Sequence, residues 1–393
     1  MFYTPRHIIF IMFILVCTEY GGDSVLRIFP IDRGTPDLIF KVLISFMALF
    51  FMISFGLKIP NKISLIMPFI LFMGVIFFGF FHGLISNNPV NAINETIPFL
   101  FIVLFLSFSA IKKPLSSSEI EFGLKILVYI VTFKILFYLI ASYLFYGIPS
   151  WKILVKQSPL MLIALSVFLS KITAIKKPKE NINLLLFLIT LCIVFSSARM
   201  LFLASVFTFC AYFLNRRLIQ SFRMIAIVGI SFTIYLIVAG GGITYFSTYL
   251  YAGEVFEEGM AYRLVQLDII INRLINSPFL GVGFGYFNPE YLTYGLLAKP
   301  YQLELDILNF ISKIGAIGTF FYGLAYFLLF RLIDKITDED IKRISKSLFI
   351  SLIAFMIYSL GQTAHQGVTY WIYLAFVYGF VVSHLKAQYK ISS

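Results

Sequence analysis

The sequence predicts an all-α, polytopic integral membrane protein built as a helical bundle, and three observations support this fold class. Of its 393 residues, 60% are hydrophobic and 18% are aromatic, whereas only 13% carry a charge. Soluble domains are about 45–50% apolar and about 25% charged, so a chain of this composition needs lipid around it. Apolar runs of roughly 20 residues, the length that crosses a bilayer, recur along the whole chain. Disordered tails, secreted disulfide scaffolds and nucleic-acid-binding enzymes are excluded.

Counting these runs gives about twelve transmembrane helices, so residues 1–393 are expected to form one membrane domain. The first run follows a single Arg and no cleavage site, which indicates a span and not a removed signal peptide. Most connections are short, but residues 243–304 form one long loop. The expected spans are 5–20, 37–57, 62–84, 96–112, 120–146, 157–175, 181–197, 199–215, 223–242, 305–331, 345–361 and 367–385.

The net charge of +12 is distributed unevenly between the two sides of this bundle. If the N-terminus is cytoplasmic, nineteen Lys and Arg lie in inward loops and eight in outward loops. Because cytoplasmic loops carry the excess of Lys and Arg, both termini are expected inside and the loop 243–304 outside. The basic character is thus explained by membrane topology, and no nucleic-acid partner is expected.

The outward cations are candidates for anion binding, because the charge rule disfavours them there. Arg199 ends the tight outer turn 195–199, which leaves almost no loop to carry its guanidinium into water. An Arg at or within the membrane interface is by default a functional hypothesis. The alternative is an Arg whose head reaches the lipid headgroups. Lys156, just before Ser158 and Pro159, can add to the same anion site.

Within the long loop, residues 262–276 predict an amphipathic helix stopped by Ser277 and Pro278. Its apolar face is expected against the bundle or the membrane surface. A second arc of the helix is polar, and a solvated basic edge is the alternative to a binding role. The apolar face holds Leu264, Leu267, Ile271 and Leu274, and the polar arc holds Arg263, Gln266 and Arg273.

Three alternating glycines, Gly281, Gly283 and Gly285, follow this helix. They do not have the Gly-x-Gly-x-x-Gly spacing of a dinucleotide loop and no strand precedes them. We expect a turn in which the backbone closely approaches other backbone or a ligand.

The tenth span begins with a polar stripe formed by Asp306, Asn309 and Lys313. Their i, i+3, i+7 spacing places them on one side of an otherwise apolar helix, which should face the bundle interior. Glu304 points about 200° away from Asp306 if both are helical. Only one of the two carboxylates then heads the stripe, unless the helix starts near residue 305. An ion pair between Asp306 and Lys313 alone also explains the stripe.

His365 lies in an outer loop, where a solvated histidine is the favoured interpretation and a substrate contact the alternative. The four histidines are scattered and no acidic pair is present, so no metal site and no other cofactor are expected. Cys17, Cys192 and Cys210 lie inside apolar runs and are interpreted as core residues.

Taken together, Arg263, the run 276–285 and the acidic-start span that ends at 315–318 resemble the O-antigen polymerase and O-antigen ligase family of bacterial envelope glycosyltransferases. The turn 196–199 resembles an earlier motif of that family. The resemblance implies a GT-C-like enzyme of surface polysaccharide or lipopolysaccharide biosynthesis in the bacterial inner membrane. It would act in the periplasm, without metal or cofactor, on undecaprenyl-diphosphate-linked oligosaccharides as donor and acceptor. Membrane lipid and a chain-length regulator protein are the further partners implied.

The resemblance also implies roles for single residues. Arg199 and Arg263 match the outer arginines of the family and would clamp the diphosphate. The ligases carry a His where this chain has Glu304, which favours the polymerase branch and leaves the base open between Glu304 and Asp306. Arg273 and Lys156 would steer the anionic substrate. Further substrate contacts are expected from Gln266, Asn309, Lys313 and His365.

Two alternatives remain open at this point. One is an O-antigen ligase of the same family, and the other is a lipid-linked oligosaccharide flippase or polysaccharide exporter of about twelve spans. A flippase should line a central cavity with charge along several spans. Here the outward cations concentrate at Arg199 and in the loop 243–304, which favours the transferase.

Overall fold

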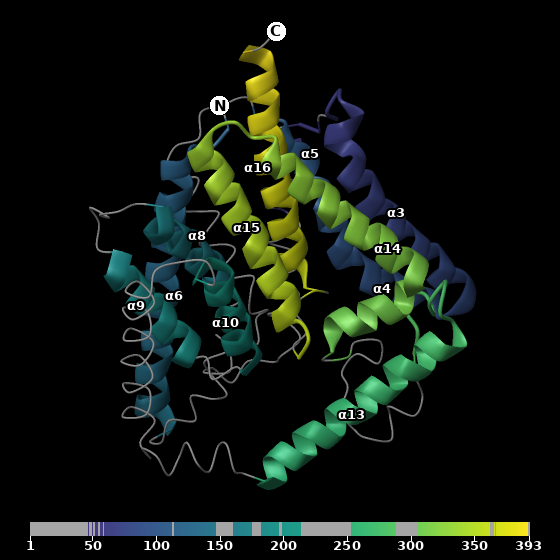
Figure 1. The fold of residues 1–393 in the computed structure, drawn as a ribbon. Helices are drawn as coiled ribbons and strands as arrows, with labels where there is room; N and C mark the ends of the chain where they lie inside the picture. The colour runs from purple at the N-terminus through teal and green to yellow at the C-terminus, as the bar shows by residue number, and fades with distance from the viewer. Residues whose placement is uncertain are drawn as a thin grey trace. The chain divides into compact units, whose positions relative to one another are not determined.

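A computed structural model describes most of the second half of the chain and the middle of the first. The residues described are 46, 49, 52–53, 56–57, 59–111, 114–146, 160–174, 182–195, 199–213, 253–287, 303, 305–361, 365 and 367–391. Every regular element in these ranges is a helix, which confirms the all-α class (Figure 1).

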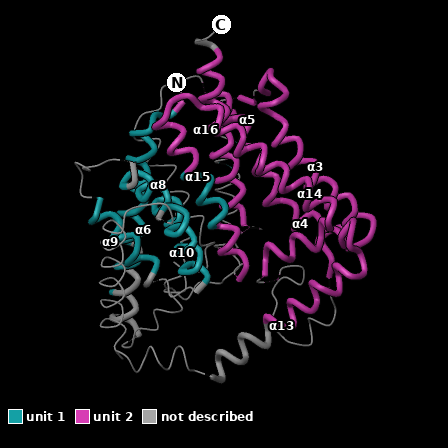
Figure 2. Tube along the Cα trace, in the orientation of Figure 1, with its two compact units in different colours: residues 1–49, 115–253, 347–354 teal, residues 50–114, 254–346, 355–393 magenta. Residues whose placement is uncertain are grey.

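The chain forms two compact units, shown in separate colours in Figure 2. The residues of α15 (Glu339–Tyr358) are divided between them, with 347–354 in unit 1. Unit 1 also contains α6 (Ser117–Tyr146), α8 (Met161–Ala174), α9 (Ile182–Phe195) and α10 (Arg199–Phe213). Unit 2 contains α3 (Ile63–Ser86), α4 (Pro89–Leu100), η2 (Phe101–Val103), α5 (Leu104–Ser109), α13 (Gly253–Asn276), α14 (Asp306–Asp334) and α16 (Val368–Ile391).

Four helical stretches of the described chain are long and apolar enough to cross a membrane, and all four belong to unit 2. They support a membrane protein and match four of the expected spans. In unit 1, shorter apolar helices occupy the expected spans 157–175, 181–197 and 199–215, and the longer α6 occupies 120–146. The expected spans 5–20 and 223–242 lie outside the described residues, as does most of 37–57. The four long stretches are Ile63–Ser86, Pro89–Ser109, Asp306–Asp334 and Val368–Tyr389.

The second of these stretches starts seven residues earlier than the expected span 96–112, because its first turn is well capped. The Asn88 side chain accepts hydrogen bonds from the backbone N–H groups of Val90 (2.9 Å) and Asn91 (3.4 Å). Pro89 occupies the first helical position, where its missing N–H is not needed. The earlier start brings Glu95 into the helix.

α14 is broken in its first half, at Gly315, whose φ of 63° and ψ of −171° are not helical. Residues 306–314 form a short arm and residues 316–334 a long arm, and the change of direction is visible in Figure 1. The long arm is about 28 Å long at the rise of an α-helix. That length nearly matches the hydrocarbon core of roughly 30 Å, so the long arm can cross the membrane alone. The expected span 305–331 is thus present as Asp306–Asp334, and the break at Gly315 is a feature that the sequence did not predict.

Within unit 2, α14 packs mainly along α3, and α16 packs along α5 and touches α4. The ring of Phe105 stacks on that of Tyr378 at 3.9 Å between centroids, across the α5–α16 contact. The Tyr378 hydroxyl donates to the backbone carbonyl of Leu65 at 2.6 Å, which ties α16 to α3. A fully buried aromatic cluster thus lies at the centre of these helices.

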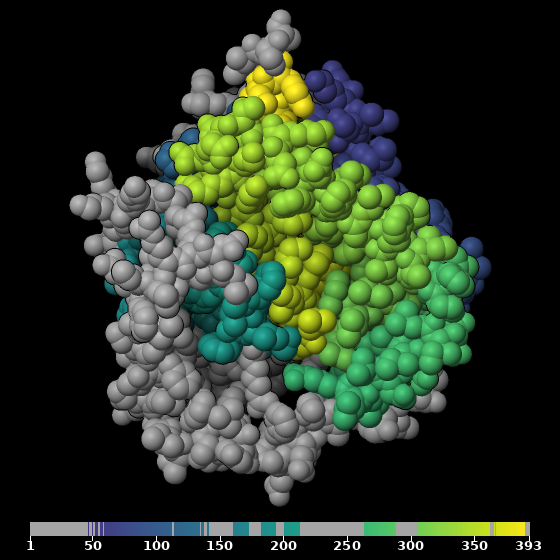
Figure 3. Space-filling model, in the orientation of Figure 1, coloured from purple at the N-terminus to yellow at the C-terminus, as the bar shows by residue number. Residues whose placement is uncertain are grey.

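α13 contains the expected helix 262–276, but its inward face is the polar one. Gln266 is fully buried and Arg273 is 4% exposed, whereas Leu264 is 58% and Ile271 45% exposed. The apolar face is divided: Leu267 and Leu274 are partly buried and pack against a buried cluster that includes Leu303 and Leu305, whereas Leu264 and Ile271 point outward, as the membrane-surface alternative expects. The outer sides of α13 and α14 form part of the face drawn in Figure 3.

Candidate functional site

The glycine loop, residues 277–285, donates hydrogen bonds to backbone carbonyl groups at the end of the short arm of α14. The last turn of any helix leaves carbonyl groups without a partner. Here the N–H of Val282 donates to the carbonyl of Ser312 at 3.2 Å, and the N–H of Gly283 donates to that of Lys313 at 3.0 Å. The loop thus replaces the missing helical donors.

The same loop serves the start of the long arm. The N–H of Ala316 donates to the carbonyl of Pro278 at 2.9 Å, and the N–H of Ile317 donates to that of Phe279 at 3.1 Å. Unsatisfied backbone groups are costly in a membrane, where water cannot replace the partner. The glycine loop therefore makes the break in α14 tolerable at membrane depth.

Only glycine fits at the closest points of this corner. Gly281 and Gly283 have φ values of 71° and 77°. A Cβ on Gly283 would lie 2.7 Å from the backbone nitrogen of Gly83, and one on Gly315 would lie 2.4 Å from the nitrogen of Gly281. The expected close approach of the backbone is confirmed, and what it approaches is other backbone of this chain.

Glu95 joins the glycine loop to the short arm. One carboxylate oxygen accepts a hydrogen bond from the Lys313 ammonium, and the other accepts from the N–H of Gly285 at 2.7 Å. The side chains of Lys313 and Glu95 are 0% and 1% exposed. The sequence analysis missed Glu95, although a single acid inside an apolar helix is a signal for a buried partner. The Lys313 ammonium bonds Glu95 directly, while Asp306 acts on it as a further charge.

Arg273 connects α13 to the short arm. Its Nη1 donates to the side-chain oxygen of Asn309 at 2.8 Å, and its guanidinium lies 4.7 Å from the centre of the Tyr286 ring. Such a cation–π contact is worth about 2 kcal/mol when desolvated. Arg273 also repels the Lys313 ammonium, so two cations lie near each other in the corner.

Gln266 makes a second connection between α13 and α14, at Leu305, one turn before Asn309. Its side-chain oxygen accepts from the N–H of Leu305 at 3.2 Å, which caps the start of the short arm. The side-chain nitrogen of Gln266 is buried and has no hydrogen-bond partner among the described residues. Because α14 begins at Asp306, this residue heads the stripe.

All three residues of the polar stripe, Asp306, Asn309 and Lys313, are 0% exposed, so the expectation that they face the interior is confirmed. Arg273, Lys313, Glu95 and Asp306 together supply two cations and two carboxylates to the buried corner. The charges of this group therefore balance, which lowers the cost of burying each of them. In the described ranges no three His, Cys, Asp or Glu side chains gather as metal ligands.

His365 is fully buried, so the favoured expectation of a solvated histidine is wrong. Its Nε2 lies 2.5 Å from the hydroxyl of Tyr322, and its backbone carbonyl accepts from the indole N–H of Trp371 at 2.8 Å. The Phe310 ring of the short arm covers it at 4.7 Å between centroids. Burial lowers the pKa of His365 from 6.5 to about 3, so the imidazole is neutral at physiological pH.

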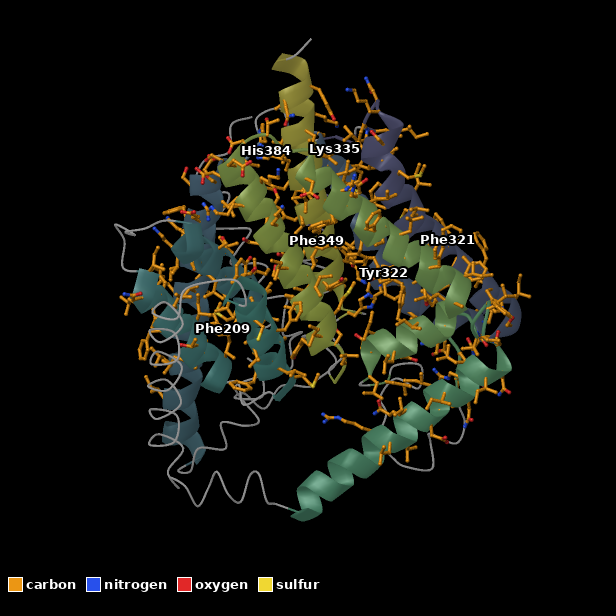
Figure 4. The ribbon with its side chains drawn as sticks, viewed as in Figure 1. Phe209, Phe321, Tyr322, Lys335, Phe349 and His384 are labelled. Carbon is orange, nitrogen blue, oxygen red and sulfur yellow. The ribbon has the colours of Figure 1, made fainter. Side chains whose placement is uncertain are left out.

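The long arm presents different faces to the two sides. Tyr322 is 5% exposed and points into unit 2, while its neighbour Phe321 is 41% exposed and points outward (Figure 4). The hydroxyls of Tyr322 and Tyr326 are 3.1 Å apart, and that of Tyr326 also pairs with Tyr370 on α16. A chain of polar groups thus leads from His365 along the inner face of the long arm.

Of the remaining predicted site residues, the structure describes the side chain of Arg263 alone. Arg263 is partly exposed on α13, ten residues before Arg273. Arg199 is the first residue of α10 in unit 1, and its side chain lies outside the described residues. Lys156 and Glu304 also lie outside them.

In comparisons with known proteins, no family model, no curated protein and no solved structure matches this chain. The assignment of a function therefore depends on the chemistry of the corner itself.

Proposed function

We propose that this protein is a surface-polysaccharide polymerase that joins undecaprenyl-diphosphate-linked oligosaccharide units at the periplasmic face of a bacterial inner membrane. The observation that carries the proposal is the corner of α14. There a carboxylate at the head of a membrane helix, Asp306, lies one turn before Asn309, which accepts a hydrogen bond from the buried guanidinium of Arg273. A carboxylate beside cations is the pair of groups that glycosyl transfer from a diphosphate requires.

In this reaction the acceptor sugar hydroxyl attacks the anomeric carbon of the donor. The bond from that carbon to the diphosphate oxygen breaks, and the lipid diphosphate leaves with the electron pair. The hydroxyl proton passes to a carboxylate, either Asp306 or Glu304. Negative charge that develops on the leaving diphosphate is stabilised by arginine, whose planar fork matches phosphate oxygens. Arg199 and Arg263 are the arginines proposed for this role.

The apolar surface of unit 2 supports the lipid-linked nature of the substrate. The outer face of α13 carries the exposed side chains of Leu264 and Ile271. On the long arm, the side chains of Phe320 and Phe321 are 65% and 41% exposed. A polyprenyl chain can stay in the bilayer against such a surface while its headgroup reaches the polar corner. No enclosed channel for the lipid is then needed.

The test is complementation of a deletion strain of the host bacterium, read as the ladder of surface glycan on a gel. Arg199→Ala, Arg263→Ala and one of Glu304→Gln or Asp306→Asn should reduce the ladder to a single repeat unit. Asp268→Asn changes an exposed carboxylate that accepts a hydrogen bond from Asn272 of the same helix. This variant should leave the ladder intact. All variants are compared at equal amounts in the membrane. If the deletion strain itself makes a full ladder, the proposal is wrong.

A lipid-linked oligosaccharide flippase or exporter is the second candidate, and the broken helix favours it. Transporters place substrate and ion sites at interrupted membrane helices, and α14 is interrupted at Gly315 beside the buried pair of Glu95 and Lys313. The same strain separates the two functions. Loss of a transporter keeps every repeat unit from the outer face, whereas loss of a polymerase leaves single units there. Loss of an O-antigen ligase would instead leave free polymer that is not joined to the lipid core.

A further inference from the structure

The polar contacts of α13 converge on the short arm of α14. Gln266 caps its start through the N–H of Leu305, and Arg273 bonds Asn309 one turn further on. At the other end of the arm, Lys313 is held by Glu95. The short arm is therefore fixed at three successive points along one face.

Asp306 lies on this fixed arm, three residues before Asn309 and on the same face. Asn309 and Lys313 each have a protein partner, so their side chains are engaged in anchoring. A carboxylate that acts as a base must be held within a fraction of an ångström of its productive position. The anchors supply that precision to Asp306.

The geometry points to Arg273 as a positioning residue that acts through Asn309 to hold the Asp306 carboxylate as the proton acceptor. This inference rests on the proposed function, and it chooses Asp306 over Glu304 as the base. It also changes the role expected for Arg273. Its guanidinium is bonded to Asn309 and packed on Tyr286, so it serves the protein instead of steering the substrate.

Several charged or titratable groups share the corner with Asp306 and would shape its response to pH. Lys313 of the same arm interacts electrostatically with Asp306, and it also interacts with Arg273 of α13 and Glu95 of α4. From the long arm, the Tyr322 hydroxyl interacts electrostatically with Asp306. His365 contacts the ring of Phe310, one turn along the arm from Asp306, and is neutral. Removal of Arg273 leaves the ion pair of Glu95 and Lys313 intact.

The test uses spheroplasts of the deletion strain, whose outer membrane face meets the buffer directly. Each carries one variant and is pulse-labelled with a sugar precursor, and the initial rate of polymer formation is measured from pH 5 to pH 9 at equal amounts of protein. The rate falls on the acidic side where the base becomes protonated. Arg273→Gln should move this acidic limb to higher pH by about one unit, because a neighbouring cation favours the ionised carboxylate.

Asn309→Ala should move the limb in the same direction, and the double variant should move it no further than Arg273→Gln alone. Arg273→Lys keeps the positive charge and should restore the position of the limb. Arg343→Gln, which removes a partly buried Arg of α15 that pairs with the exposed Asp340, should leave the profile unchanged. A purely structural role would lower the rate equally at every pH, and that result overturns the inference. Independent, additive effects of Arg273 and Asn309 also overturn it.

This experiment separates the inference from the proposed function. If wild-type spheroplasts form no more polymer than the deletion strain, the proposed function fails. If the wild type forms polymer but Arg273→Gln leaves the acidic limb in place, the proposed function stands and the inference fails.

Discussion

At the scale of single residues, Lys313 and Glu95 form an ion pair whose side chains are almost fully buried. The attraction between two buried charges offsets the free-energy cost of their desolvation only when both are well hydrogen-bonded. Glu95 meets this condition because it also accepts a hydrogen bond from the N–H of Gly285. Either partner left alone would be an uncompensated charge in an apolar interior.

Glu95→Gln or Lys313→Met alone should lower the free energy of unfolding by about 3–5 kcal/mol, the cost of breaking a buried pair from one side. The double variant should lose less than the two single losses added, because no charge is then left unpaired. Unfolding of the detergent-solubilised protein, followed by circular dichroism, measures both quantities.

A matched control for this cycle is the pair of Glu339, which is exposed, and Lys342, which is partly buried, at 4.0 Å on α15. Glu339→Gln and Lys342→Met should change the free energy of unfolding by less than about 1 kcal/mol. Simple additivity at Glu95 and Lys313 would show that the two side chains do not depend on each other.

His365 gives the protein a defined dependence on pH. Its pKa is about 3 in the folded chain and 6.5 without burial, so the unfolded chain takes up this proton first as the pH falls. The stabilisation is complete above pH 6.5 and is lost as the pH falls towards 3. The loss amounts to about 1.4 kcal/mol for each pH unit in that window.

Thermal unfolding measured between pH 7.5 and 4.5 should therefore show a falling melting temperature, and His365→Gln should make the curve flatter. His384→Gln, at a half-buried position of α16, should keep the wild-type slope. Equal slopes in the wild type and in His365→Gln would show that another group titrates there.

At the scale of elements, the corner of α14 depends on backbone geometry that only glycine adopts cheaply. Gly315 and Gly283 both have positive φ and both lie against other backbone. A residue with a side chain held at such an angle costs on the order of 1–3 kcal/mol, before any steric overlap is counted.

Gly315→Ala and Gly283→Ala should accordingly reduce the amount of folded protein recovered from membranes. Gly323→Ala and Gly74→Ala are the controls, because a Cβ at either position meets no atom within 4 Å. The fraction that elutes as a single peak in size-exclusion chromatography measures the effect. Recovery of all four variants at the wild-type level would mean that the corner can rearrange.

The sequence predicted the polar stripe of α14 because helical spacing alone brings Asp306, Asn309 and Lys313 to one face. It could not predict the break, since Gly315 sits between Ile314 and Ala316 and looks like an ordinary helix glycine. The donors and acceptors that allow the break come from the glycine loop, which is distant from it in the chain. Local propensity contains no information about them.

The same limit explains the error on His365. The burial of His365 is decided by Tyr322 and Phe310, which lie more than forty residues before it. Glu95 was missed for a similar reason, because its partner Lys313 is 218 residues away.

At the scale of the whole molecule, the charge asymmetry predicts that the site opens to the outside. Asp268 is exposed on α13, and Lys335 ends α14 at the opposite end of the long arm. With both termini cytoplasmic, these two positions should lie on opposite sides of the membrane.

Single cysteines at Asp268→Cys and Lys335→Cys, in a chain whose native cysteines are replaced by serine, test this topology. A membrane-impermeant maleimide added to intact spheroplasts should label the first position and not the second. After permeabilisation both should react. The opposite pattern would place the corner of α14 in the cytoplasm and exclude a periplasmic reaction.

The bridging of the broken helix by the glycine loop also constrains the order in which the chain is assembled. The loop is tied to Asn87, Gly79 and Glu95 near the start of unit 2, across separations of up to 205 residues between Gly79 and Phe284. During synthesis the early helices enter the membrane long before the loop that joins them. Because the loop in turn precedes α14, its partners for the bend are already present when Gly315 is made, while α15 and α16 are still to follow. A chain truncated before Ser312 would therefore leave the N–H groups of Val282 and Gly283 without the acceptors that they have in the folded protein.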